Sequence, residues 1–317
     1  MFGSQIVRVL NNANYNVRAF VRKEADRTEL RNLDYELFEG EITRQPDVND
    51  AVKGCDFVIH AAARTLQAPS NLNFYRKPNI DSTKYLIEAC KKNKVRRFVY
   101  ISTANCFRNG TRENPGNEQS PFMSWLRDSG YAFSKYLAQQ MVLKEVSADG
   151  FDAVIVNPTF IIGSNDLKRS SGQIFFYVLD KHVAFYPPGG KNFVDAEAAA
   201  DGVLRAMKNG RTGECYLLAG ENHTYLEFFK MVKKISAQRT VLIPIPKWII
   251  LFCGNLGSFI EKIFGTPIQL TRANAKMLCL GNYFTSSKAV KELGFKMIPT
   301  KQSIEKRLNG FHQSIKK

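Results

Sequence analysis

Arg97-Phe-Val-Tyr-Ile-Ser-Thr103 and, further along, Tyr131-Ala-Phe-Ser-Lys135 are the stretches that decide the fold class of this chain. The first is an apolar, β-rich run that predicts a buried strand ending on two hydroxyls, Ser102 and Thr103. The second puts a phenol and an ammonium at i and i+4, on one face of a predicted helix. Parallel sheets bind ligands at their carboxyl edge, so the two stretches predict a pocket where hydroxyl, phenol and ammonium meet.

These groups suit acid–base chemistry on a carbonyl. A nearby cation stabilises a phenolate, so we expect Lys135 to lower the pKa of Tyr131 and make it a usable acid and base. Thr103, with Ser102 as second candidate, can donate a hydrogen bond to the same oxygen. A second match to the spacing, Tyr177-Val-Leu-Asp-Lys181, has no hydroxyl partner upstream, and we interpret its aromatic surroundings as packing.

Strand-like and helix-like segments alternate along the first half of the chain, at the spacing of βαβ units. This pattern predicts an α/β fold, a Rossmann-like doubly wound parallel sheet with a smaller, mostly helical substrate-binding lobe. The dinucleotide-binding domain is expected at 1–157 and 191–220, and the substrate-binding lobe at 158–190 and 221–317. Strands are expected at 16–21, 35–39, 56–60, 98–102, 152–156 and 214–219, and helices at 3–12, 46–53, 79–92, 131–146 and 196–208.

The composition, with 44% hydrophobic and 23% charged residues among 317, is typical of a globular protein. A formal net charge of +16 permits an anionic ligand such as a phosphorylated cofactor. The basic residues are dispersed without a nucleic-acid-binding motif, so we expect no nucleic-acid partner. Six cysteines lack metal-ligand spacing, and no secretory signal is present, which predicts reduced, buried thiols in a cytoplasmic protein without a metal.

The segment 241–264 is the most hydrophobic of the chain. Pro244, Pro246, Lys247 and Glu261 interrupt it, so a membrane-spanning helix is not expected. Three interpretations stay open: a lid over an apolar substrate, peripheral contact with a membrane, or an ordinary buried helix.

The chain opens with Met1-Phe-Gly-Ser-Gln, which corresponds to the end of a glycine-rich turn between a first strand and its helix. Gly3 is expected to be the last glycine of that turn. The sequence predicts that Met1 is an internal methionine of a longer protein, with the first strand missing here. The alternative is a genuine short form that cannot grip a pyrophosphate.

Several short segments resemble, in their order and spacing, the extended short-chain dehydrogenase/reductases of the NAD-dependent epimerase/dehydratase superfamily. Within that family the chain is most similar to the branch of 3β-hydroxysteroid dehydrogenases and dihydroflavonol reductases. The resemblance covers essentially the whole chain. Its markers are Gly3, Asp56-Phe-Val-Ile-His-Ala-Ala-Ala63, Asn79-Ile-Asp-Ser-Thr83, Tyr100-Ile-Ser-Thr-Ala104, Tyr131-Ala-Phe-Ser-Lys135, Asn157-Pro-Thr-Phe-Ile-Ile-Gly163 and Ser286-Ser-Lys-Ala-Val-Lys-Glu-Leu-Gly-Phe295.

The resemblance implies roles for matching positions. Tyr131 is expected to be the proton donor and acceptor, Lys135 to bond the nicotinamide ribose, and Thr103 or Ser102 to orient the carbonyl. The implied cofactor-binding residues are Gly3, Glu41, Ile42, Ala61, Ala62, Ala63, Asn79, Tyr131, Lys135, Pro158, Thr159 and Phe160. Asn79 is equally compatible with a purely structural role.

The end of the second expected strand bears on cofactor choice, because NAD sites place a carboxylate there and NADP sites an arginine. Here the strand ends at Phe20-Val-Arg-Lys23, with Arg27 following. We expect Arg22 to bind the 2′-phosphate, assisted by Lys23 or Arg27, since arginine's fork suits phosphate. NADP(H) is therefore favoured and NAD(H) remains possible.

The function predicted first is an NADP(H)-dependent oxidoreductase that interconverts a carbonyl and an alcohol on an apolar small molecule. The alternative is an NAD-dependent nucleotide-sugar epimerase, with Lys168, Arg169 and Lys191 available for a diphosphate. A third hypothesis is a non-catalytic NADP-binding scaffold. The resemblance also implies a possible homodimer through the helices at 79–92 and 131–146.

Overall fold

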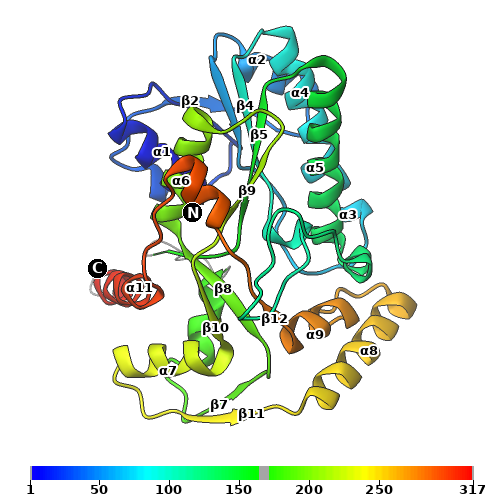
Figure 1. Cartoon of the computed structure of the whole chain (residues 1–317), viewed down its shortest axis with the longest axis vertical. Helices are drawn as coiled ribbons and strands as arrows, with labels where there is room; N and C mark the ends of the chain where they lie inside the picture. The colour runs from blue at the N-terminus through cyan, green and yellow to red at the C-terminus, as the bar shows by residue number, and fades with distance from the viewer. Residues whose placement is uncertain (1, 164–170, 316–317) are drawn as a thin grey trace.

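The computed structural model describes residues 2–163 and 171–315, arranged as a sheet-containing body and a second lobe below it (Figure 1). The helices are α1 Phe2–Asn12, α2 Gln45–Val52, α3 Asn73–Tyr75, α4 Ser82–Lys92, α5 Gly130–Asp149, α6 Ala196–Asn209, α7 Tyr225–Ile235, α8 Lys247–Phe264, α9 Arg272–Cys279, α10 Ser287–Leu293 and α11 Thr300–Ile315. The strands are β1 Arg18–Val21, β2 Glu36–Glu39, β3 Phe57–His60, β4 Arg97–Ile101, β5 Ala153–Pro158, β6 Phe160–Ile162, β7 Val183–Tyr186, β8 Gly190–Asp195, β9 Cys215–Leu218, β10 Glu221–Thr224, β11 Val241–Pro244 and β12 Gly281–Asn282.

The body is built on two parallel sheets. Strands β3, β4, β5 and β9 pair in that order, and β1 pairs with β2. Among the described residues β1 and β3 belong to different sheets. The strand at 214–219 rejoins the larger sheet beside β5, as its sequence predicted.

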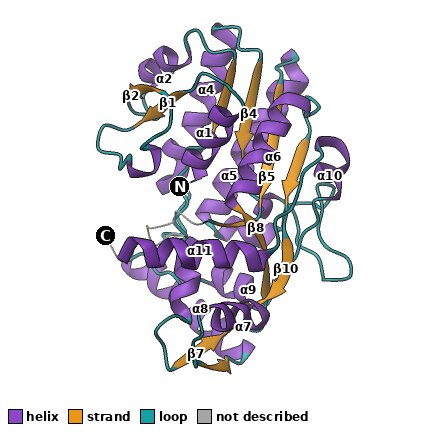
Figure 2. Ribbon diagram, turned by 90° about the vertical axis from the view of Figure 1, so that its left-hand side faces the viewer, coloured by secondary structure: helices purple, strands orange, loops and turns teal. Residues whose placement is uncertain are grey.

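Helices cover both faces of the larger sheet (Figure 2), because residues of a strand alternate between its faces. In β4, Phe98 and Tyr100 pack with α2, α4 and α5, whereas Val99 and Ile101 pack with α1 and α6. All four side chains are at most 7% exposed. This two-sided burial explains the continuous apolar run, and it confirms the doubly wound α/β fold class.

The second lobe has its own sheet, in which β8 pairs with β6, β10 and β12. A separate two-stranded sheet joins β7 to β11. An aromatic core of Phe175, Phe193, Phe228 and Phe229 lies between this lobe's strands and α7. The predicted division of the chain at residues 157, 190 and 220 stays a prediction.

Local expectations were mostly met, with some corrections. The predicted helix at 79–92 begins earlier, at Asn73, and runs through a π-helical turn at Arg76–Asp81 before α4. The interpretation of the aromatic stretch around Tyr177 as packing is confirmed for Phe175, which is 2% exposed in the core of the second lobe, but it is wrong for Tyr177, which is 61% exposed at the end of a short 3-10 helix. The prediction of buried thiols is confirmed for Cys90, Cys106 and Cys215, whereas Cys55 and Cys279 are half-buried and Cys253 is exposed.

The structure also bears on the three interpretations of the segment 241–264. It forms β11 and α8, and in α8 only Ile250, Gly254, Gly257 and Glu261 are buried. The interpretation of this segment as an ordinary buried helix is therefore wrong. Within residues 2–163 and 171–315, no helix has both the length and the apolar character that crossing a bilayer requires.

Candidate active site

Three strand ends meet at the carboxyl edge of the larger sheet. Strand β3 ends before Ala61–Ala63, β4 before Ser102 and Thr103, and β5 runs into Pro158–Phe160. Because β3, β4 and β5 are parallel neighbours, their carboxyl ends lie side by side. The structure thus brings these predicted site residues together at the edge where such sheets bind ligands.

Helix α5 presents Tyr131 to this edge from its first turn. The helix begins at Gly130 because the Ser129 hydroxyl accepts a hydrogen bond from the Ala132 N–H. A Cβ on Gly130 would lie 2.6 Å from the Ser70 carbonyl oxygen and 2.7 Å from the Tyr75 ring. The absence of a side chain at Gly130 therefore allows α5 to approach the loop after β3.

The Thr103 hydroxyl lies near the Tyr131 phenol, close enough to affect its ionisation. Burial raises the pKa of Tyr131 to about 12, and the neighbouring Thr103 side chain offsets part of that rise. The predicted lowering of this pKa by Lys135 is thus not found in the structure. The phenol is protonated at neutral pH.

Lys135 is 2% exposed and its Nζ donates a hydrogen bond to the Ile101 carbonyl oxygen at 2.6 Å. The ammonium also lies 4.2 Å from the centroid of the Tyr100 ring. Burial lowers the pKa of Lys135 to about 7. Ser102, by contrast, contacts the Cys106 Sγ at 3.3 Å, so its hydroxyl is already engaged.

Asn79 connects the loop after β3 to α5. Its Oδ1 accepts a hydrogen bond from the Arg64 N–H at 2.7 Å, and its Nδ2 donates to the Arg64 carbonyl and to the Ser134 hydroxyl. Ser134 in turn donates to the Tyr131 carbonyl oxygen. Both amide hydrogens of Asn79 are used in these contacts, which position the turn that carries Tyr131. Direct contact of Asn79 with a cofactor stays a prediction.

The remaining predicted cofactor residues lie in three places: on α1, directly after β1, and in the turn after β2. Gly3 is exposed in the first turn of α1, and a Cβ there would meet no atom within 4 Å. Arg22 and Lys23 are exposed just past β1. Arg27 forms an ion pair with Glu39, so its guanidinium is already engaged.

Glu41 and Ile42 follow β2. The Glu41 N–H donates a hydrogen bond to the Asp47 carboxylate at 2.9 Å, and Ile42 packs against the core beside α2 and α4. These contacts anchor the turn. The cofactor contacts of Gly3, Arg22, Lys23, Glu41 and Ile42 stay predictions.

A buried asparagine that the sequence analysis did not single out holds the third strand end in place. Asn192 is 1% exposed, and its Oδ1 accepts hydrogen bonds from the Thr159 hydroxyl at 2.7 Å and the Gly220 N–H at 2.8 Å. Its Nδ2 donates to the Asn222 Oδ1 at 2.7 Å. The available signal was a polar residue directly before the apolar run Phe193-Val194.

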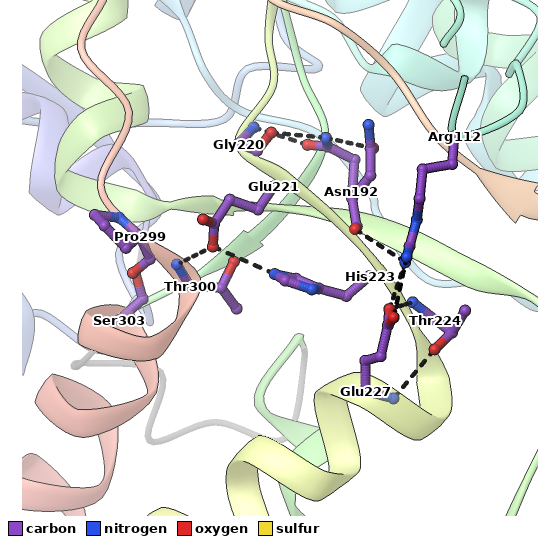
Figure 3. A network of polar contacts seen from close by, with 11 residues as sticks. Arg112, Asn192, Gly220, Glu221, His223, Thr224, Glu227, Pro299, Thr300 and Ser303 are labelled. Carbon is purple, nitrogen blue, oxygen red and sulfur yellow. Dashed lines mark hydrogen bonds and ion pairs between the residues drawn. The ribbon is translucent and has the colours of Figure 1, made fainter. Parts of the chain in front are cut away.

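Figure 3 shows how this network continues across the second lobe. Arg112 reaches from a loop of the body to the Glu227 carboxylate and the Asn222 carbonyl. Glu227 also accepts a hydrogen bond from the Thr224 N–H, which closes the capping box of α7. The network connects the Arg112 loop, β10 and α7 to β8, the strand whose Asn192 side chain binds Thr159.

Comparison with known proteins agrees with this geometry. The model of the NAD dependent epimerase/dehydratase family matches residues 1–219. The chain belongs to this family. The predicted recognition and the prediction of an NAD(P)-dependent oxidoreductase class of enzyme are thereby confirmed at the level of the family.

Relatives with curated names align with most of the chain. It is 27% identical over 278 residues to the "Sterol-4-alpha-carboxylate 3-dehydrogenase ERG26, decarboxylating" of Candida albicans, covering 82% of this chain and 78% of that protein. It is 26% identical over 320 residues to the "3 beta-hydroxysteroid dehydrogenase/Delta 5-->4-isomerase" of Mycobacterium tuberculosis, covering 95% and 84%. The crystal structure of gox2253 superposes with a TM-score of 0.87 at 27% identity, over 99% of this chain and 96% of that one.

Proposed function

We propose that the chain is an NADP(H)-dependent oxidoreductase that interconverts a carbonyl and an alcohol on an apolar small molecule. The placement of the Thr103 hydroxyl and the Tyr131 phenol near each other at the carboxyl edge of the sheet, one helical turn from Lys135, carries this proposal. Two O–H groups that meet at the carboxyl edge of a parallel sheet can both turn toward one carbonyl oxygen.

The residues fit a dinucleotide. Helix α1 presents its N-terminus and the exposed Gly3, where close approach of a pyrophosphate meets no side chain. Within the described residues no acid forms an ion pair with Arg22 or Lys23, which leaves both cations for a 2′-phosphate. The first residues after β3, Ala61–Ala63, are small enough for close approach.

The chemistry follows from the groups at the edge. When bound, the nicotinamide supplies or accepts the hydride. Tyr131, protonated at neutral pH, donates its proton to the substrate oxygen during reduction, and in the reverse direction its phenolate form accepts the proton of the alcohol. Thr103 donates a hydrogen bond to the same oxygen, and Lys135 positions the strand end through the Ile101 carbonyl.

An apolar substrate is supported by the second lobe and by the relatives. Phe160 packs edge to face on Phe193 at 5.7 Å, directly after Thr159. The two curated relatives described above are named for sterol and steroid substrates. We therefore propose a fused-ring or similarly apolar ketone or secondary alcohol.

The test is turnover of NADPH with a panel of ketosteroids, isoprenoid aldehydes and aromatic ketones. Tyr131→Phe is expected to lower kcat by about 10²–10⁴-fold, with a much smaller effect on NADPH affinity. Tyr136→Phe is the matched control, since Tyr136 lies on the same helix and stacks on Phe122 at 4.2 Å. If neither NADPH nor NADH binds, the oxidoreductase proposal fails and the scaffold hypothesis remains.

Cofactor choice is tested by calorimetry with NADPH and NADH. Arg22→Ala is expected to weaken NADPH binding by about 10- to 100-fold, because one charge-assisted hydrogen bond is lost, and to leave NADH unchanged. Arg31→Ala, an exposed arginine of the neighbouring turn, is the control. Equal effects of Arg22→Ala on both cofactors would contradict the assignment.

One observation favours the nucleotide-sugar epimerase as a second candidate. Lys191 lies with its Nζ 4.9 Å from the Phe160 ring centroid, and burial lowers its pKa to about 8. A cation in that place suits an anionic substrate group. Lys168 and Arg169, which were predicted to assist, lie outside the described residues. Epimerisation of a nucleotide-linked hexose without net NADPH consumption would favour this candidate.

A further inference from the structure

Helix α8 carries its small residues on the face toward the protein and its large apolar residues on the face toward solvent, the reverse of an ordinary surface helix. Its inner face carries Gly254 and Gly257, where a Cβ would lie 2.3 Å from Ala275 Cβ and 2.2 Å from the Leu270 carbonyl oxygen. The large apolar residues point outward, at the spacing of one helical stripe. Their exposed fractions are 70% for Trp248, 65% for Phe252, 48% for Leu256, 61% for Phe259, 56% for Ile263 and 72% for Phe264.

The small sheet of β7 and β11 continues this apolar surface. The pairs Val183–Val241 and Phe185–Ile243 lie on one side of it, and all four side chains are between 38% and 58% exposed. Strand β11 leads directly into α8, and both lie at the end of the molecule remote from the larger parallel sheet (Figure 1). The outer stripe of α8 and these four residues are called the α8–β11 surface below.

The exposed charges that α8 itself carries are of one sign. Glu261, the one acidic residue in the sequence of α8, is turned inward and accepts hydrogen bonds from the Ser70 N–H and hydroxyl. Lys247 and Lys262, near the two ends of the helix, are exposed, as is Arg272 at the start of α9. Next to β7, by contrast, Asp180 carries an exposed carboxylate. The helix therefore presents aromatic and aliphatic side chains between cations and no exposed carboxylate of its own.

We propose that the α8–β11 surface docks on the surface of an anionic lipid bilayer, with α8 lying in the plane of the interface. Apolar side chains on one face with flanking lysines are the features that hold amphipathic helices at charged membranes. An exposed tryptophan suits the boundary between head groups and acyl chains. A second copy of the chain fits less well, because a two-fold contact through α8 would bring like charges together.

Co-sedimentation with vesicles of about equal parts phosphatidylglycerol and phosphatidylcholine tests the proposal. We expect the chain to sediment with these vesicles, to bind phosphatidylcholine vesicles at least about tenfold more weakly, and to be released by salt. The triple variant Phe252→Ser, Phe259→Ser, Phe264→Ser is expected to lose at least about tenfold in vesicle affinity. The control Leu37→Ser, Val290→Ser, Met297→Ser, at positions 41%, 44% and 50% exposed elsewhere, is expected to bind normally.

A second readout reports directly on the helix. The chain has two tryptophans, so Trp125→Phe leaves Trp248 as the reporter. Its emission is expected to shift to shorter wavelength on adding the anionic vesicles, and to stay unchanged with phosphatidylcholine alone.

Three results would overturn the proposal. They are failure of the unmodified chain to bind the anionic vesicles, equal loss of binding in the test and control variants, and a stable dimer that only the test variant dissociates. Circular dichroism of both triple variants separates loss of the surface from loss of the fold.

Discussion

Replacing Lys135 by methionine probes the cost of a buried ammonium in this fold. Burial lowers the pKa of Lys135 from 10.5 to about 7, so protonation in the folded chain is disfavoured by roughly 5 kcal/mol. At pH 7 the folded amine is half protonated. Relative to a lysine with an unshifted pKa, this lowers the free energy of unfolding by about 4 kcal/mol. Methionine removes that loss but leaves the Ile101 carbonyl without its partner, at a cost of about 1–3 kcal/mol. The variant is therefore expected to gain about 1–3 kcal/mol at pH 7 and to lose turnover.

The sign of the effect changes with pH. Between pH 7 and 10.5 the unfolded chain holds the proton that the folded chain has released, so the stability of the unmodified protein rises with pH across this window. Lys135→Met lacks that rise, and above pH 10.5 only the lost hydrogen bond remains, which makes the variant the less stable protein. Urea unfolding at pH 7, 8.5 and 10 measures the difference.

The matched control is Lys144→Met, because Lys144 is exposed on the same helix. It is expected to keep the pH dependence of the unmodified chain. A stability difference between the unmodified chain and Lys135→Met that stays constant from pH 7 to 10 would refute the reasoning.

Three further outcomes are expected. Gly130→Ala should lower the free energy of unfolding by about 1–3 kcal/mol, because its Cβ would lie 2.6 Å from the Ser70 carbonyl, whereas Gly3→Ala should not change it in thermal unfolding. Asn192→Ala should cost about 3 kcal/mol in urea unfolding and raise KM for the cofactor, since Thr159 and the Gly220 N–H lose their acceptor. The rate of alcohol oxidation should rise with pH toward about 12 while carbonyl reduction stays flat to about pH 10, as steady-state profiles would show.

The elements that the sequence predicted well are those whose signals are local. Strand β4 was expected at 98–102 and lies at Arg97–Ile101, because an apolar run buried on both faces leaves few other structures open to it. Helix α5 was expected at 131–146 and lies at Gly130–Asp149, ending at Gly150 with a φ of 64°. Motif spacing then placed Thr103 and Tyr131 at one edge of the sheet, where the structure also has them.

The sheet of the second lobe carried no such signal. Strand β10 is the polar run Glu221–Thr224, and β12 is two residues long, so neither has the alternation typical of a strand. Both are strands because β8 pairs with them, and β12 comes from a segment far along the chain. Asn192 escaped notice for the same reason, since its partners Thr159, Gly220 and Asn222 are adjacent only after that sheet forms.

The pKa of Tyr131 shows where reasoning from spacing reaches its limit. Positions i and i+4 place two Cβ atoms on one helical face, but they do not fix where the long lysine side chain ends. Here the Lys135 Nζ donates its hydrogen bond to the Ile101 carbonyl oxygen, and the side chain that lowers the pKa of the phenol is that of Thr103. Desolvation outweighs that effect and raises the pKa of Tyr131 to about 12, which is the direction opposite to the one that the spacing predicted.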